Sequence, residues 1–94
     1  MPVDDLQVVF ARSDDVLMTD SGDMKVLMAI DTGQFVELNH IGRAIWDLTD
    51  GENSVAHIIA ALQDRYAVQE QECTAHVQAF LGELLVEKLV RRKD

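Results

Sequence analysis

The first half of the chain alternates between short apolar runs and clusters of turn-forming residues. The runs span residues 16–20, 24–30 and 34–38, and the clusters between them are Ser21-Gly22-Asp23 and Asp31-Thr32-Gly33. Short runs rich in Val, Ile, Leu, Met and Phe favour β-strands, and Gly beside Asp favours tight turns. The pattern predicts an antiparallel meander of three strands. An earlier apolar piece, residues 6–10, is a further candidate strand, set apart by a polar break at residues 12–15.

From residue 39 onward the apolar period becomes that of a helix. Asn39 and Ser54 are residue types that cap helix N-termini, and each precedes apolar positions spaced i, i+3, i+4, i+7. These positions are Ile41, Ala44, Ile45 and Leu48 after the first cap, and Val55, Ile58, Ile59 and Leu62 after the second. We predict one helix that starts at His40 and is ended by Gly51, and a second that closes near Tyr66.

A third and longest helix is predicted over residues 69–88. One side carries a broad apolar stripe, and the other carries small or apolar residues where a solvated helix usually has charged ones. The stripe is Cys73, Val77, Phe80, Leu81, Leu84 and Leu85, and the other side is Ala75, Ala79, Gly82 and Val86. The second side is either an alanine-rich solvent face or a face that another surface approaches closely. Leu89-Val90 is expected to pair with the sheet before a basic tail frays.

Three strands followed by three helices, without a linker or repeat, predict a single α+β domain over residues 1–94. The helices should lie on one face of a small antiparallel sheet. Arrangements of this size include winged helices.

Charge and composition exclude several classes of partner and chemistry. Eight basic and seventeen acidic residues give a net charge of −9, which repels nucleic acids and anionic membranes. The single cysteine cannot form an internal disulfide, and the chain has neither a signal-peptide pattern nor an apolar run of membrane-spanning length. These features predict a reduced, cytoplasmic, soluble protein.

The candidate catalytic groups do not assemble a mechanism. Cys73 and His76 lie one helical turn apart, as a nucleophile and base or half a metal site would, but Cys73 also continues the apolar stripe. We interpret it as a buried hydrophobic residue. His40 and His57 have no partner at ligand spacing, and the glycines are isolated, so there is no phosphate-binding loop. The sequence predicts no catalytic residue, metal or cofactor.

A small domain of this kind acts by binding. A three-stranded sheet has two unpaired edges, and an extended peptide can add to either as another strand. The strand Gln34–Leu38 and the helix from Cys73 to Leu84 are the candidate walls of such a site.

The residues from Phe35 to Gly51 resemble the signature of the PqqD-like family, the prototype of the recognition element for precursors of ribosomally made, modified peptides (RiPPs). The joint spacing of Leu38-Asn39, Ile45-Trp46 and Asp50-Gly51 carries the resemblance, and Ser54-Val55, Tyr66-Ala67-Val68, Val77 to Leu84 and Leu89-Val90 continue it in order. It covers about residues 16–90. Two positions depart from the pattern: His76 stands where members often have Asp, and Lys88 where Gly often precedes the last Leu-Val.

The resemblance implies a winged-helix-like fold and binding of a precursor's leader peptide as an added strand against the third strand and third helix. It also implies no catalysis, and delivery of the precursor to a lasso-type leader peptidase or a radical SAM enzyme. Phe35 with Ile45-Trp46 is more similar to the lasso type. The predicted peptide-binding residues are Gln34, Phe35, Val36, Glu37, Leu38, Cys73, His76, Val77, Phe80 and Leu84.

Alternation along a strand places either Phe35 or Val36 in the core and leaves Glu37 exposed, where it can meet a basic leader residue. On the helix, core packing is an alternative role for Val77, Phe80 and Leu84, and Trp46 is expected in the core. Two other functions stay open: a winged-helix DNA-binding regulator and a structural subunit that dimerises through the small-residue helix face. The regulator is opposed by the third helix, which offers only Lys88 against four glutamates. The chain is expected to be a monomer or a weak homodimer.

Overall fold

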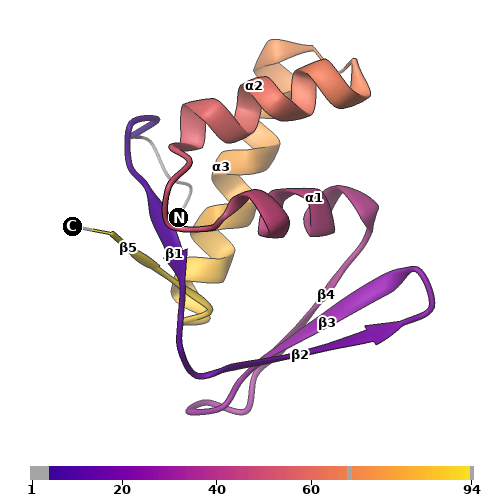
Figure 1. Cartoon of the computed structure of the whole chain (residues 1–94), viewed down its shortest axis with the longest axis vertical. Helices are drawn as coiled ribbons and strands as arrows, with labels where there is room; N and C mark the ends of the chain where they lie inside the picture. Colours follow the sequence, from indigo (N-terminus) through magenta and orange to yellow (C-terminus); the bar gives the residue numbers. More distant parts are fainter. Residues whose placement is uncertain (1–4, 68, 94) are drawn as a thin grey trace.

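Three helices lie on one side of a three-stranded sheet, and a second pair of short strands joins the two ends of the chain (Figure 1). The computed structural model describes residues 5–67 and 69–93. The elements in order are β1 (Phe10–Arg12), β2 (Val16–Ser21), β3 (Met24–Ala29), β4 (Phe35–Leu38), α1 (His40–Leu48), α2 (Val55–Tyr66), α3 (Glu70–Val86) and β5 (Val90–Arg92). The predicted α+β class and element order are confirmed.

The predicted meander is present as β2-β3-β4, antiparallel throughout. Both connecting turns use a glycine with positive φ, +62° at Gly22 and +72° at Gly33, which side chains rarely adopt. Leu27 at the centre of the sheet lies opposite Met18 on one side and Val36 on the other. Directly opposed residues share a face, so the register defines two faces of different character. The inner face carries the buried Leu27, Ala29 and Leu38, and the outer face carries the exposed Leu17 and Phe35.

Side chains cap the first two helices as the sequence predicts. The Asn39 Oδ1 atom accepts the N–H of Gly42 at 2.9 Å, and the Ser54 Oγ atom accepts the N–H of His57 at 3.1 Å. Helix α1 ends at Leu48 with Thr49 as its C-cap, so the left-handed Gly51 (φ +84°) lies in the loop beyond the cap rather than directly after the helix. The loop that follows is held in shape because Asp50 accepts the N–H groups of Glu52 and Asn53, which lowers the Asp50 pKa.

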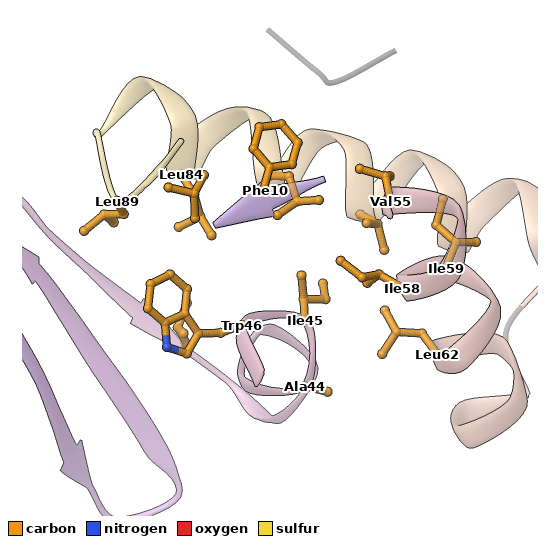
Figure 2. Packing of buried hydrophobic residues seen from close by; sticks show 14 of the residues in the cluster. Phe10, Ala44, Ile45, Trp46, Val55, Ile58, Ile59, Leu62, Leu84 and Leu89 are labelled. Atoms are coloured by element: carbon orange, nitrogen blue, oxygen red, sulfur yellow. The ribbon is translucent and has the colours of Figure 1, made fainter. Parts of the chain in front are cut away.

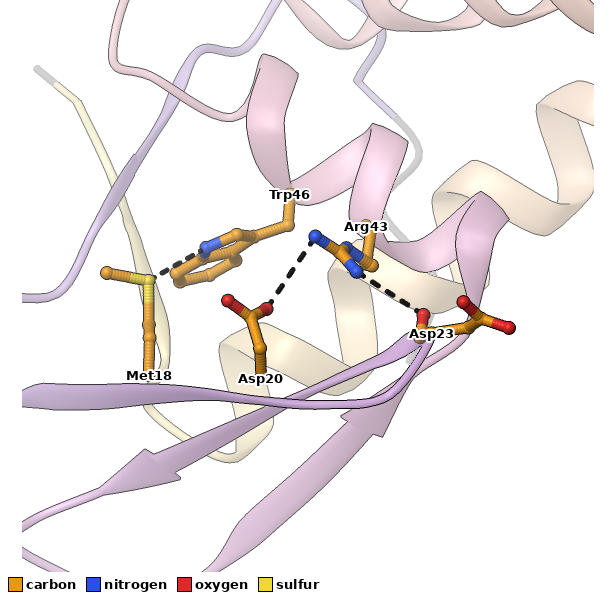
Figure 3. Close-up of polar contacts among 5 residues, drawn as sticks. All are labelled: Met18, Asp20, Asp23, Arg43 and Trp46. Carbon is orange, nitrogen blue, oxygen red and sulfur yellow. Dashed lines mark hydrogen bonds and ion pairs between the residues drawn. The ribbon is translucent and has the colours of Figure 1, made fainter.

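The core lies between the helices, the inner face of the sheet and β1 (Figure 2). Trp46 is fully buried there, as predicted, and three contacts fix its position. The Arg12 guanidinium stacks 4.9 Å from the indole ring centre and donates to the Trp46 carbonyl at 2.9 Å. From the other side, the indole N–H donates to the Met18 Sδ atom at 3.3 Å (Figure 3). Trp46 therefore connects α1 to β1 and to β2.

The chain ends are arranged differently from the expectation. The early strand is Phe10–Arg12 rather than residues 6–10, and it pairs with β5 instead of joining the meander. Leu89-Val90 likewise does not reach the three-stranded sheet, and Arg91 and Arg92 are in a strand rather than frayed. The cause is the left-handed Lys88 (φ +62°), which turns the chain back after α3 so that Leu89 and Val90 are buried.

None of the helices within the described residues is long and apolar enough to cross a membrane.

Candidate functional site

One edge of β4 pairs with β3, and no described strand pairs with the other edge. The hydrogen-bond register shows which backbone groups that free edge offers. The Ala29 N–H donates to the Gln34 carbonyl at 2.9 Å, so these opposed residues form a hydrogen-bonded pair. Bonded and non-bonded pairs alternate along an antiparallel ladder, so Val36 and Leu38 direct their backbone groups at β3. The N–H and C=O groups of Phe35 and Glu37 face the free edge.

The β4 side chains alternate as predicted. Val36 is half-buried and Leu38 is buried on the inner face, whereas Phe35 and Glu37 are exposed on the outer face. Gln34 precedes the strand and is exposed. The structure thus places Leu38 in the core and leaves the other four predicted β4 residues accessible to different degrees.

The five predicted residues of α3 divide in the same way. Val77 and Leu84 are completely buried, which is the core-packing role, and Cys73 is only 4% exposed. His76 is exposed and Phe80 is half-buried. Of the five residues, His76 and Phe80 are the most accessible, and Val77 and Leu84 are buried in the core.

Phe80 reaches from α3 to the junction of β4 and α1. A Cβ atom added at Gly42 would lie 3.4 Å from the Phe80 Cζ atom and 3.3 Å from the Leu38 Cβ atom. The distance to Leu38 is tighter than an ordinary van der Waals contact and the distance to Phe80 is an ordinary one, so a side chain at position 42 would press against Leu38 and touch the Phe80 ring. Phe80 brings α3 to the end of β4 through this contact.

An apolar pocket of about 280 Å³ lies between the three helices, close to this junction. Its lining combines the predicted Cys73 and His76 with Ile41 and Leu62 from the apolar stripes, Tyr66 from the end of α2, and Glu72 from the first turn of α3. Helical periodicity places Ile41 and Leu62 on apolar faces, but it cannot show that three different helices converge on one opening. The available signal was a tyrosine at the predicted end of a helix, a residue type with an apolar ring and a polar tip, and the structure places Tyr66 half-buried there.

The chemistry of the pocket suits binding rather than reaction. Burial raises the pKa of the Cys73 thiol, and the Sγ atom lies 3.7 Å from the Ile59 carbonyl oxygen, to which it donates. A thiol kept protonated is a poor nucleophile, which confirms the interpretation of Cys73 as a buried hydrophobic residue. Among the described residues, no three His, Cys, Asp or Glu side chains are grouped closely enough to hold a metal ion.

Comparisons with known proteins find the same fold. Two solved structures resemble the chain with a TM-score of 0.77 each: TbiB1 in complex with the TbiA(beta) leader peptide, at 26% identity, and a lasso peptide synthetase B1 complexed with a leader peptide, at 17%. The alignments cover 86% and 87% of this chain and 94% and 96% of those chains. The second likeness, at its low identity, shows the fold alone. A comparison with curated proteins finds no match.

The sequence itself identifies the family. Residues 25–90 match the family model described as coenzyme PQQ synthesis protein D (PqqD), which is more than two thirds of the chain. Members of this family bind peptides and do not catalyse reactions, so the expectation of a non-enzyme is confirmed. From the matched residues, the shared fold and the open edge beside an apolar pocket, we conclude that the chain belongs to the PqqD family and is homologous to recognition elements that bind precursor leader peptides.

Proposed function

We propose that this protein captures the leader peptide of a ribosomally made precursor by strand addition to β4 and presents the precursor to a leader peptidase or a radical SAM enzyme. The observation that carries the proposal is the unpaired edge of β4 beside the apolar pocket of α1, α2 and α3. The edge supplies main-chain hydrogen bonds, and the pocket supplies a place for a side chain.

The two parts of the site contribute differently to recognition. The backbone groups of Phe35 and Glu37 can pair with any extended peptide, because every residue except proline carries the same donor and acceptor. The pocket accepts an apolar side chain and rejects a charged one, since burial of an unpaired charge is costly. Strand addition therefore supplies affinity, and the pocket beyond the end of β4 supplies selectivity for an apolar anchor in the leader.

The alternatives weighed from the sequence fit this surface less well. A DNA-binding helix needs Lys or Arg for phosphate contacts, and α3 contains neither. On its small-residue face, Gly82 is buried while Ala75, Ala79 and Val86 are exposed. A dimer through that face would show as a sedimentation coefficient that rises with protein concentration and is unaffected by leader peptide.

Proline substitution at the free edge of β4 tests strand addition directly. Glu37→Pro removes an N–H that faces the ligand and no bond to β3, so the sheet should survive while the ladder to the leader is broken. An unsatisfied buried partner costs about 1–3 kcal/mol, which predicts leader binding weaker by about tenfold or more. The measurement is fluorescence anisotropy with a labelled leader peptide that the wild type binds.

Two matched variants complete this test. Glu37→Gln keeps the backbone donor and should retain most of the affinity. Val16→Pro places the same ring at the first residue of β2, on the opposite edge of the sheet, and should leave leader binding unchanged. The strand-addition model is wrong if Glu37→Pro is folded by circular dichroism and binds the leader as tightly as the wild type, or if Val16→Pro is the variant that loses binding.

A further inference from the structure

The outer face of the three-stranded sheet is an exposed apolar surface that the core does not use, and of the predicted leader-binding residues only Phe35 and Glu37 lie on it. Five large hydrophobic residues of the described chain are strongly exposed, and three of them lie on this face or in its β3-β4 turn: Leu17, Ile30 and Phe35, each 52–63% exposed. The register places Leu17 opposite Met28, and Met28 opposite Phe35, in one row across all three strands. A shallow hollow of about 470 Å³ lies over this row and is lined by Leu17, Met18, Thr19, Val26, Met28 and Phe35.

This face points away from the helices. In Figure 3, Met18 and Asp20 on β2 reach toward Trp46 and Arg43 of α1, with contacts of 3.3 Å and 3.6 Å. Alternation then directs Leu17 and Thr19 to the opposite side of β2. A contiguous apolar patch of this kind on a small protein commonly marks a surface for a protein partner.

Strand addition would not cover the outer face. A peptide paired with β4 lies in the plane of the sheet, about 4.8 Å from β4, and so extends the sheet without crossing over it. Leu17, Val26 and Met28 lie on β2 and β3, exposed or half-buried, and a leader bound to β4 would not cover them. The face is therefore free for a second partner at the same time.

The charges around the face determine what kind of partner fits. Residues 13–38 contain six carboxylates and one base, Lys25. Lys25 lies opposite Asp20 and Leu38, which places it on the inner face. The carboxylates of Asp14, Asp15 and Asp31 flank one end of the sheet, and Glu37 lies opposite Val26 on the outer face. Within residues 13–38, carboxylates therefore border the apolar surface and the one base does not; Arg43 of α1 pairs with Asp20 on the inner face.

An acidic border disfavours a second copy of this chain. Two copies joined through the same face would bring carboxylates against carboxylates, in addition to the repulsion of two chains with a net charge of −9 each. A partner whose apolar surface is bordered by Lys and Arg is instead attracted by these carboxylates. The attraction raises the association rate and fixes how the two surfaces align.

From the patch, its accessibility beside an added strand and its acidic border, we propose that the outer face of β2-β3-β4 docks the enzyme that processes the precursor, through an apolar surface bordered by basic residues. The inference rests on the proposed function, because the docked enzyme receives the leader held on β4. It adds that the enzyme and the leader bind at separate surfaces of the sheet.

Binding of the purified enzyme that processes the same precursor, measured on immobilised recognition protein by surface plasmon resonance, tests the proposal. Leu17→Glu places a charge at the centre of the patch and should weaken docking at least about tenfold, an effect typical of a central interface residue. Asp31→Lys should slow association several-fold and reduce its salt dependence. Val86→Glu is the matched control: Val86 is an equally exposed apolar residue, on α3, and its change should leave docking unaltered.

Leader affinity, measured in parallel, separates this proposal from the function on which it rests. The variants Leu17→Glu, Asp31→Lys and Val86→Glu should all bind the labelled leader within about twofold of the wild type, because none alters the free edge of β4 or the pocket. If the wild type does not bind the leader, the proposed function fails. The docking proposal is overturned if the wild type binds the leader but not the enzyme, or if folded Leu17→Glu docks normally. It is also overturned if Leu17→Glu loses the leader, or if it dissolves a wild-type homodimer seen by sedimentation.

Discussion

Cys73 lines the pocket, and its thiol can serve as a chemical probe of the pocket. Its thiol lines the pocket together with His76 and Tyr66, yet the residue is 4% exposed and burial raises its pKa. The sequence placed Cys73 on an apolar stripe, and this was enough to predict its burial. What periodicity could not show is that the residue borders a pocket, because the opening depends on how α1 and α2 meet α3.

Alkylation of Cys73 should therefore be slow in the folded protein. Only the thiolate reacts, so a raised pKa lowers the rate at neutral pH and moves the midpoint of the pH–rate profile upward from that of the unfolded chain. Iodoacetamide at pH 8 should modify the native chain at least about tenfold more slowly than the chain in urea. A leader whose anchor occupies the pocket should slow the reaction further.

Mass spectrometry of the single cysteine gives this rate directly, and Cys73→Ser supplies the background. A native rate equal to the rate in urea would contradict the burial of Cys73. A rate unchanged by saturating leader would exclude the pocket as the anchor site while leaving strand addition on β4 untouched.

On α3, neighbouring residues of one stripe have separate roles. The sequence predicted the stripe but could not divide it between core and ligand contacts, since both roles favour apolar side chains at the same spacing. The structure separates the two roles by burial. Val77 is completely buried, whereas Phe80 is half-buried beside Gly42 and Leu38.

Truncation of these two side chains should have opposite consequences. Val77→Ala leaves a cavity and should lower the free energy of unfolding by about 2 kcal/mol, with leader dissociation nearly unchanged. Phe80→Ala should speed leader dissociation at least about tenfold, with a smaller loss of stability because part of the ring is exposed. Urea unfolding and stopped-flow dissociation measure the two quantities. Equal effects of both variants on dissociation would refute the division of α3 into core and contact residues.

Among the strands, pairing between sequence neighbours was predictable, and pairing between the two ends of the chain was not. The three strands of the meander and their turns were predictable because each run is bounded by a glycine turn and pairs with its neighbour in sequence. The pairing of β1 with β5 was not. Each strand has three residues, and the opposed residues Phe10 and Arg92 are 82 positions apart. The turn that directs β5 also depends on a lysine, not a glycine, at position 88. Local patterns contain no information about such a distant partner.

At the scale of the whole molecule, the excess of negative charge should affect the association rate of a ligand more than its dissociation rate. The chain carries a net charge of −9, and Glu37 and Glu72 stand beside the proposed leader site. Exposed charges raise association rates over a screening length of about 8–10 Å, whereas a single exposed ion pair contributes only about 0.2–1 kcal/mol.

For a leader that carries Lys or Arg, raising NaCl from about 0.02 to about 0.5 M should slow association several-fold and leave dissociation nearly unchanged. Glu37→Gln should reproduce the effect on a smaller scale. A leader with its basic residues replaced by glutamine is the matched control and should show little salt dependence. Stopped-flow traces across the salt series separate the two rates, and a salt effect confined to dissociation would count against electrostatic steering.

The pairing of β1 with β5 also determines how this domain could be connected to other proteins. Because Phe10 lies opposite Arg92, the chain enters and leaves the folded unit side by side. In Figure 1 this pair lies across the molecule from the β2-β3 turn. A surface loop of a host enzyme could therefore accept the domain as an insertion, with both junctions at one point and β4 facing outward. The same geometry means that a force pulling on the two ends would open β1 and β5 one hydrogen bond at a time, as a zipper opens, before any strain reached the leader site.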